Sequence, residues 1–220
     1  DCTKCIGCRA CQNTCKRTHG LERAGDDPRY DMPTELSAHS LTLIQLYKES
    51  DQKWSFVKKQ CLHCSIPSCV SVCPVSAFKK RDDGVVAYDE SKCIGCRYCC
   101  VACPFNAPTF EYDKAAPEIK KCDFCKDLRL AKGLQPWCAE VCPKGAIKFG
   151  HRGDLLAEAH KRINDNPDLY EPHVYGEIEI GGTSVLYLAP KGITFEQLGY
   201  KMYGEVPPFK IQEDIQHGIF

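Results

Sequence analysis

Cysteine spacing is the feature of this sequence that points most directly to chemistry. Eighteen of the 220 residues are cysteine, and sixteen of these fall into four quartets that each end in a C-x3-C step. The quartets are Cys5, Cys8, Cys11 and Cys15; Cys61, Cys64, Cys69 and Cys73; Cys93, Cys96, Cys99 and Cys103; and Cys122, Cys125, Cys138 and Cys142. Cys2 and Cys100 are left over.

The tight spacing of the first and third quartets is typical of iron ligands. In a C-x2-C-x2-C run, three thiolates converge on three corners of one cubane cluster. In two-cluster ferredoxins the fourth cysteine, followed by proline, ligates the other cluster. Proline follows Cys73, Cys103 and Cys142, whereas Lys16 follows the first quartet. The pattern predicts four [4Fe-4S] clusters, with all sixteen quartet cysteines as iron ligands and no catalytic residue.

Two other uses of cysteine explain the pattern less well. Disulfide scaffolds also have even cysteine numbers, but thiols two residues apart on a tight loop pair poorly with each other. Structural zinc sites combine one C-x2-C with a separate C-x2-C or histidine pair, whereas the first and third quartets each have three cysteines in close succession. Iron–sulfur ligation is therefore the better interpretation.

Two internal repeats support the register of the quartets. Residues 4–9 read KCIGCR, and the same six letters recur at residues 92–97. In this alignment neither Cys2 nor Cys100 matches another cysteine, so both are predicted to be free. A C-P-x-x-A repeat follows the other quartets, and its small alanine is expected to let the backbone pass close to a cluster. These alanines are Ala77, Ala107 and Ala146.

The remaining candidate residues have simpler explanations. His63 lies inside the second quartet, but each quartet already has four cysteines, so packing beside a cluster is predicted rather than ligation. Residues 181–182 are both glycine but lack the strand and helix context of a dinucleotide site, and no phosphate-binding loop occurs. The basic residues 79–81 are expected to form a solvated hairpin edge. No substrate site and no nucleotide site are indicated.

Composition argues against nucleic-acid binding and against a membrane-spanning helix. Lysine and arginine total 29 and aspartate and glutamate total 29, so the formal net charge is zero, which argues against a nucleic-acid-binding protein. Apolar runs are far shorter than the ~20 residues of a membrane-spanning helix. Hydrophobic residues make up 43 %, but roughly 35 % without cysteine, so bound metal is expected to supply part of the stability.

The elements that must position the cysteines are short. Residues 77–88 are predicted to form a β-hairpin with residues 83–84 as its turn, and a short strand is predicted at 54–58. The stretches 16–53 and 126–137 resemble insertions between these elements and the quartets.

The C-terminal part is predicted to contain one helix and one strand. An apolar face over residues 154–163 indicates a surface helix with Asp154 capping its first turn, and residues 183–188 form the predicted strand. The tail from 193 to 220 has too few contacts of its own to justify its apolar content, so it is expected to lie on a partner. Its apolar residues include Phe195, Leu198, Tyr200, Tyr203 and Phe209.

In two-cluster ferredoxins the fourth cysteine of each quartet ligates the cluster of the other quartet, so the four quartets here are predicted to form two pairs. Nineteen residues separate quartets two and three, whereas forty-five separate quartets one and two. The shorter link suits a compact two-cluster module, which leaves quartet one to pair with quartet four around it. The predicted sites are Cys5, Cys8, Cys11 with Cys142; Cys122, Cys125, Cys138 with Cys15; Cys61, Cys64, Cys69 with Cys103; and Cys93, Cys96, Cys99 with Cys73.

This pairing predicts an α+β fold of two nested ferredoxin-like modules of the bacterial 2[4Fe-4S] type. Residues 1–15 plus 111–150 form the outer module and residues 54–110 the inner one. Residues 16–53 are an insertion, and residues 151–220 supply the C-terminal helix, strand and partner-binding arm.

The quartets, the C-P-x-x-A repeats and the segment 171–183, which includes EPHVYGE and GGT, resemble a known family. The chain is similar over about residues 1–190 to the four-cluster ferredoxin-like electron-transfer subunits of membrane-bound respiratory oxidoreductases. Within that group it most resembles the ferredoxin-like subunit of quinone-linked nickel–iron hydrogenases. The resemblance also implies the nested pairing.

The resemblance implies a non-catalytic relay of single electrons in anaerobic respiration. Its partners would be a molybdopterin-type or nickel–iron catalytic subunit or a multihaem cytochrome c, together with a polytopic quinone-binding membrane subunit. Attachment to the periplasmic face of a bacterial inner membrane would come through these partners. A free polyferredoxin carrier is the alternative, against which the insertions and the tail argue. A self-contained reductase would need a substrate or flavin site that is not evident.

Overall fold

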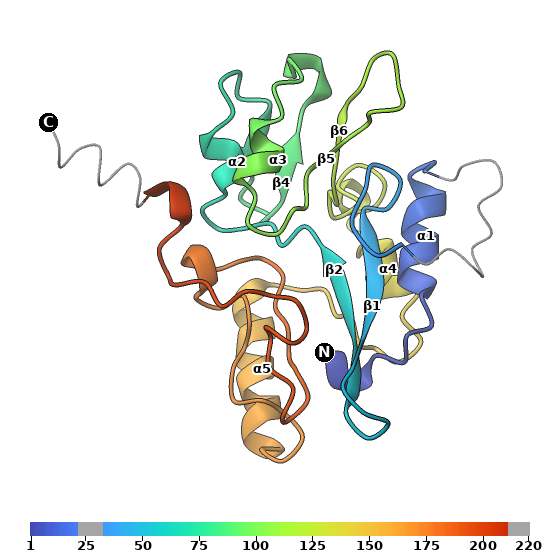
Figure 1. Ribbon diagram of the computed structural model, residues 1–220, viewed down its shortest axis with the longest axis vertical. Helices are drawn as coiled ribbons and strands as arrows, with labels where there is room; N and C mark the ends of the chain where they lie inside the picture. The colour runs from blue at the N-terminus through green and yellow to red at the C-terminus, as the bar shows by residue number, and fades with distance from the viewer. Residues whose placement is uncertain (22–32, 211–220) are drawn as a thin grey trace, which may run out of the picture.

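This computed structural model describes residues 1–21 and 33–210 (Figure 1). They contain short helices and three separate two-stranded sheets, joined by turns and loops. The helices are α1 (Ala10–Thr18), α2 (Ser68–Ser71), α3 (Tyr98–Ala102), α4 (Trp137–Glu140) and α5 (Arg152–Asp165), with 3₁₀ turns at Cys2–Lys4, Glu90–Lys92, Leu130–Lys132 and Glu179–Gly181. The strands are β1 (Thr42–Lys48), β2 (Trp54–Gln60), β3 (Phe78–Lys80), β4 (Val86–Tyr88), β5 (Thr109–Phe110) and β6 (Ile119–Lys120). The predicted mixture of helix and strand is confirmed.

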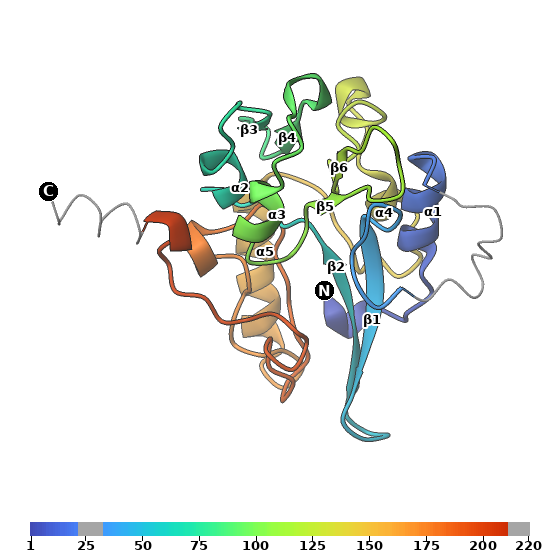
Figure 2. The same cartoon turned by 45° about the horizontal axis from the view of Figure 1, so that its top comes forward.

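The four short helices that carry quartet cysteines pack in two pairs. Helix α1 contacts α4, and α2 contacts α3; both views show these pairs side by side (Figure 2). Helices α2 and α4 each start after a proline at the N-cap, Pro67 and Pro136. Proline suits a helix start because it has no N–H to leave unsatisfied. Each helix pair thus joins one KCIGCR-type quartet to one proline-started quartet.

The KCIGCR repeat folds the same way at both of its positions. Gly7 and Gly95 have φ angles of 68° and 71°. Arg9 and Arg97, the N-caps of α1 and α3, have φ angles of 57° and 63°. A positive φ is costly for residues with a Cβ atom, and a Cβ at Gly7 would also lie 2.4 Å from the Phe56 ring. Glycine therefore permits the turn between the first two cysteines of each repeat.

The hairpin of β1 and β2 contains a strand that the sequence analysis missed. The predicted strand at 54–58 is confirmed as β2, and it pairs antiparallel with β1 from Thr42 opposite Gln60 to Lys48 opposite Trp54. Strand β1 lies inside the stretch 16–53 that had been interpreted as an insertion. Its run of strand-prone residues, Leu43, Ile44, Leu46 and Tyr47, was a usable signal in the sequence.

The predicted hairpin over 77–88 is confirmed as β3 and β4, with Gly84 at φ 84° in the turn. The expectation of a solvated edge at 79–81 is wrong for Lys80. Its half-buried Nζ donates to the carbonyl oxygens of His63 and Gly84, each at 2.8 Å, and to Ser184 Oγ at 3.1 Å. The lysine turns inward because an acceptor in its own turn and two from other segments converge on it.

Helix α5 confirms the predicted C-terminal helix and extends it to Arg152–Asp165. The predicted cap is wrong, because His151 occupies the N-cap and Asp154 lies within the first turn. The predicted strand at 183–188 is also wrong. Thr183 bridges Cys64 and Tyr187 bridges Tyr175 as isolated pairs. This segment divides its hydrogen bonds between two neighbours, so no continuous ladder forms.

The tail does not behave as the predicted partner-binding arm over residues 193–203. Phe195, Leu198 and Tyr200 are only 2–4 % exposed and belong to the core cluster around Tyr175. The Tyr200 hydroxyl donates to the carbonyl oxygen of Lys58 at 2.8 Å, and the segment folds back beside α5 (Figure 1). The aromatic spacing serves the chain's own core. Residues 211–220 lie outside the described residues.

Residues 193–203 pack on their own chain. Phe195→Ala is therefore expected to destabilise the protein by about 3–5 kcal/mol, as for other large core truncations. Thermal unfolding of the anaerobically purified protein, followed by circular dichroism, measures the loss. Met202→Ala is the matched control, since Met202 is 47 % exposed in the same tail and its change should have little effect. Equal melting temperatures for both variants would contradict the packed tail.

Candidate iron–sulfur centres

All eighteen cysteines lie in the described residues and all have free thiols. Only Cys8 is exposed; the others are buried or half-buried. Thiols withdrawn from solvent without disulfide partners are arranged for a shared ligand rather than for cross-linking. The disulfide alternative therefore finds no support in the structure.

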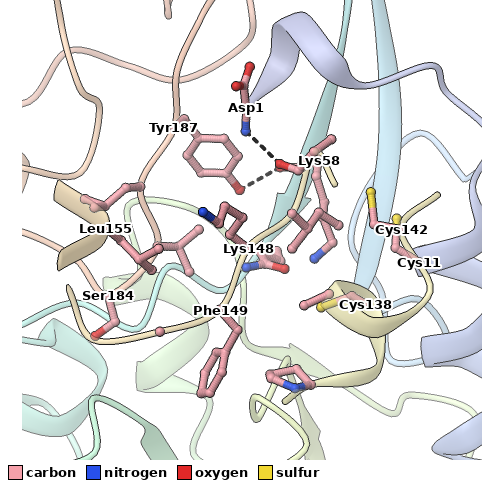
Figure 3. A pocket seen from close by; sticks show the side chains of 18 of the residues that line it. Asp1, Cys11, Lys58, Cys138, Cys142, Lys148, Phe149, Leu155, Ser184 and Tyr187 are labelled. Carbon is pink, nitrogen blue, oxygen red and sulfur yellow. Dashed lines mark hydrogen bonds between the residues drawn. The ribbon is translucent and has the colours of Figure 1, made fainter. Parts of the chain in front are cut away.

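Cysteines of the first and fourth quartets line one cavity of about 680 Å³. Cys11, Cys138 and Cys142 gather on one side of it (Figure 3). Burial raises the pKa of Cys5, and the neighbouring Cys142 and Cys8 thiols add to that rise. A cysteine from the far end of the cysteine-rich region is thus an electrostatic neighbour of the first quartet.

A second group contains Cys15, Cys122 and Cys125 together with Cys138, which also lines the first cavity. Burial raises the pKa of Cys122 well above its ordinary value, and the Cys15 and Cys138 thiols raise it further. Burial likewise raises the pKa of Cys138, with Cys125 and Cys15 contributing. Cys15, at the end of α1, therefore lies among three cysteines that come more than a hundred residues later.

A histidine and an aspartate stand beside this second group. The ligand atoms of His19, Asp123 and Cys125 lie within 4.8 Å of one another. His19 Nδ1 is 2.9 Å from the Cys15 carbonyl oxygen, and its Nε2 is 3.2 Å from Asp123 Oδ1. Since both ring nitrogens already have protein partners, His19 holds the two cysteine-bearing segments together rather than offering a free ligand atom.

The second quartet gathers with the last cysteine of the third. Burial raises the pKa of Cys69 to about 12, with Cys61 and Cys103 as contributing neighbours. Burial also raises the pKa of Cys103 to about 11, and Cys61 again adds to it. Burial also raises the pKa of Cys64, and the Cys61, Cys103 and Cys69 thiols add to the rise. This group draws three cysteines from one quartet and one from the next.

The last group lies around the α2 and α3 pair. Cys73 and Cys93 pack against buried Cys69 and Cys99 in one cluster with Phe78 and Val86. Cys96 is half-buried in the loop before α3.

Backbone amides reach the sulfur atoms where the C-P-x-x-A repeat led us to expect close approach. The Ala77 N–H donates to Cys73 Sγ at 3.2 Å, and the Ala107 N–H donates to Cys103 Sγ at 3.5 Å. Both alanines are buried. Hydrogen bonds to cluster sulfurs are one means by which a protein sets cluster potentials.

Buried lysines lie among the cysteine groups, and the sequence analysis did not identify them. Burial alone would lower the pKa of Lys58, but the surrounding thiolates of Cys138, Cys11 and Cys122 raise it well above its ordinary value. Lys121 Nζ donates to the carbonyl oxygens of Val86 and Cys122. Buried cations need nearby negative charge, which clusters with thiolate ligands supply. In the sequence these lysines look like ordinary surface lysines of short strands and loops, so nothing near them indicates burial.

The two extra cysteines have separate surroundings. Cys2 is buried in the aromatic core beside Tyr187. Cys100 is half-buried, and a hydrogen bond with the Cys99 thiol is the main cause that lowers its pKa. Their predicted freedom from iron stays a prediction.

In the described ranges 1–21 and 33–210 we find no helix with the length and apolar character needed to span a bilayer.

Comparison with known proteins places these groups in context. Two family models, each described as a 4Fe-4S dicluster domain, match residues 4–77 and 52–152. Between them the matched segments contain all four quartets. The chain accordingly holds four [4Fe-4S] clusters, as predicted.

Similar proteins come from several bacteria. A protein of Nitratidesulfovibrio vulgaris Hildenborough is 46 % identical over 207 residues, covering 90 % of this chain and 55 % of its own length. Hydrogenase-2 operon protein HybA of Escherichia coli O157:H7 is 37 % identical over 254 aligned residues, covering 100 % of this chain and 77 % of its own length. The iron–sulfur subunit of the nitrate-inducible formate dehydrogenase of Escherichia coli K12 is 36 % identical over 197 residues, with coverages of 86 % and 66 %. The chain thus spans about half the length of the first of these relatives.

Proposed function

The chain belongs to the family of ferredoxin-like 4Fe-4S dicluster subunits of respiratory oxidoreductases, and we propose that it relays single electrons through its four clusters inside such a complex. It is an electron-transfer subunit and not the catalytic one. The observation that carries this function is the gathering of the four quartets into four groups of thiols. Cubanes held in such groups exchange one electron at a time, at potentials set by hydrogen bonds, charge and solvent exposure.

The nested ligand assignment is part of this proposal. Its support is that α1 packs on α4 and α2 on α3, and that in the outer pair the fourth cysteine of each quartet is close enough to alter pKa values in the other. Cys142 does so for Cys5, and Cys15 for Cys122. Residues 1–15 with 111–150 then form the outer module, and residues 54–110 the inner one.

The two modules meet at the second and fourth quartets. The Cys61 thiol is among the neighbours that raise the pKa of Cys122, after burial. The rings of His63 and Phe124, from the C-x2-C loops of the same two quartets, stack with centroids 3.8 Å apart. Electrons that pass between the outer and inner modules would cross at this contact. The clusters of the first and third quartets would then stand at the two ends of the relay.

Exposed apolar side chains flank both of these end quartets. Ile6 is 51 % exposed in the first, while Ile94, Tyr98 and Val101 are 60–87 % exposed in and beside the third. Apolar side chains gathered at one place on a surface are typical of protein contacts. They favour a fixed subunit over the alternative of a free polyferredoxin carrier. Residues 193–203 no longer bear on that choice, because they pack on their own chain.

We assign the partners by class. A hydrogenase or formate dehydrogenase catalytic subunit would supply electrons at one end, consistent with the names of the relatives. A quinone-binding membrane subunit or a multihaem cytochrome c would stand at the other. Association with the periplasmic face of a bacterial inner membrane would come through these partners.

Purification of the native assembly in mild detergent tests the proposal. The chain is expected to co-purify in fixed ratio with an oxidoreductase catalytic subunit, and hydrogen or formate should reduce its clusters in that assembly, as seen by electron paramagnetic resonance. Val101→Asp should weaken association, whereas Val206→Asp, at an exposed site in the tail, should not. Recovery of the chain alone, without a catalytic partner, would instead support the free carrier.

A further inference from the structure

His63 is buried, as predicted, but it has one hydrogen-bonding atom without a partner. The residue is 0 % exposed. Its Nδ1 accepts a hydrogen bond from the Val86 N–H at 2.9 Å. Its Nε2 is shielded from solvent and meets no hydrogen-bond partner in the part of the chain that the structure describes. Buried polar atoms are almost always paired, so this nitrogen calls for an acceptor or donor of another kind.

The contact with Val86 decides which nitrogen carries the ring proton. Because Nδ1 accepts from a backbone N–H, it has no hydrogen of its own, and the single proton of the neutral imidazole lies on Nε2. The unpartnered atom is therefore a donor, Nε2–H.

The ring is fixed at the junction of two cysteine loops. His63 precedes Cys64 as Phe124 precedes Cys125, and the two rings stack at an interplanar angle of 29°. The carbonyl oxygen of His63 accepts from Lys80 Nζ at 2.8 Å. With Nδ1, ring face and backbone each engaged, Nε2 cannot be turned to a different partner without breaking one of these contacts.

The groups around this nitrogen leave sulfur as the acceptor. The charged neighbours of His63 are the lysines 58, 80 and 121, and ammonium groups only donate hydrogen bonds. The Asp123 carboxylate in the second loop already meets His19 Nε2 at 3.2 Å and accepts from the Cys125 N–H at 2.8 Å. The other polar side chains between and at the ends of the two C-x2-C steps are those of the cysteines. An iron–sulfur cluster adds inorganic sulfides that accept hydrogen bonds, and its negative charge fits the ring of lysines. The residues therefore fit the group.

We propose that the Nε2–H of His63 donates a hydrogen bond to sulfur of a cluster held by one of these two facing loops and thereby raises the reduction potential of that cluster. This inference rests on the proposed ligation by the quartets. A hydrogen bond to sulfur stabilises the more negative, reduced cluster more than the oxidised one. His63 would thus tune the point at which electrons cross between the two modules.

A redox titration monitored by electron paramagnetic resonance tests the proposal. His63→Phe keeps an aromatic ring for the stack but removes the donor, and it should shift one cluster to lower potential while the other three stay unchanged. Phe124→Tyr is the control, because it changes the facing ring while keeping both the stack and the donor, so it should cause no comparable shift. Unchanged or higher potentials in His63→Phe, or an equal shift in Phe124→Tyr, would overturn the assignment.

A second measurement does not depend on the His63→Phe variant folding. Pulsed electron paramagnetic resonance of reduced protein labelled with nitrogen-15 histidine should show a coupling between a cluster and a ring nitrogen. The coupling should persist in His19→Gln, which removes the other histidine beside a cysteine group. Its absence, or its loss in His19→Gln, would contradict the inference.

Iron analysis separates failure of this inference from failure of the proposed function. Fewer than four clusters in the unaltered protein would contradict the proposed function. Four clusters, together with unchanged potentials in His63→Phe, would overturn only the role of His63.

Discussion

Removal of iron from the anaerobically purified protein is expected to abolish its native fold. The sheets have two strands each, and isolated two-stranded hairpins are marginally stable in water. Much of the interior that other proteins fill with aliphatic side chains is lined here by cysteines such as Cys11, Cys69 and Cys99. Without clusters, the chain buries too little apolar surface to offset the entropy lost on ordering.

The buried lysines add to this loss. Burial disfavours the ionised form of the Cys11 thiol, because it raises the pKa of that thiol, so removal of the cluster also removes negative charge beside Lys58. Lys58 would then lie buried without the anions that hold it there. Leaving one partner of a buried ion pair uncompensated costs about 3–5 kcal/mol, a large share of the usual stability of a domain.

Circular dichroism and limited proteolysis, before and after anaerobic chelation, measure the effect. After chelation the circular dichroism signal of the native protein should be lost, and protease should cleave throughout the chain. The same chelator already saturated with iron is the control and should leave the fold intact. A cooperative thermal transition that persists in iron-free protein would contradict the expectation.

The second large effect is expected from Cys142→Ser. If Cys142 ligates the cluster of the first quartet, the change should remove or convert one cluster and leave the inner pair intact. The affected ligands lie over a hundred residues away in sequence, so no local model of the fourth quartet predicts this result. Cys100→Ser is the matched control, because it makes the same change at a cysteine outside the quartets.

Double variants show which cluster Cys142 serves. Changes within one site are not additive, whereas changes at separate sites are. Cys142→Ser combined with Cys11→Ser should lose no more iron than one cluster, but combined with Cys99→Ser it should lose two. Equal losses in the two combinations would refute the nested pairing and leave the number of clusters untouched.

Ligand spacing made the metal chemistry readable from the sequence alone. Three cysteines within seven residues can converge on one cluster by local backbone geometry, so the KCIGCR repeat indicated both the cofactor and its position. The hairpin at 77–88 and helix α5 were predictable for the same reason, since their turn and their apolar face are local patterns.

Features that depend on distant segments were not predictable in this way. Lys80 is drawn inward by acceptors on His63 and Ser184, and Phe195 is buried against Tyr175 from another part of the chain. Strand β1 exists through its pairing with β2. In each case the contact that determines the local structure comes from another part of the chain. The residues nearby in the sequence suggested a solvated, inserted or partner-bound segment instead.

Iron and acid-labile sulfide analysis of anaerobically prepared protein tests the central claim most directly. The account predicts about four cubanes per chain, hence about sixteen irons and sixteen sulfides. It predicts the same content for a Cys2→Ser/Cys100→Ser double variant, because all ligands come from the quartets. A content near two clusters, zinc in place of iron, or loss of a cluster from the double variant would contradict it.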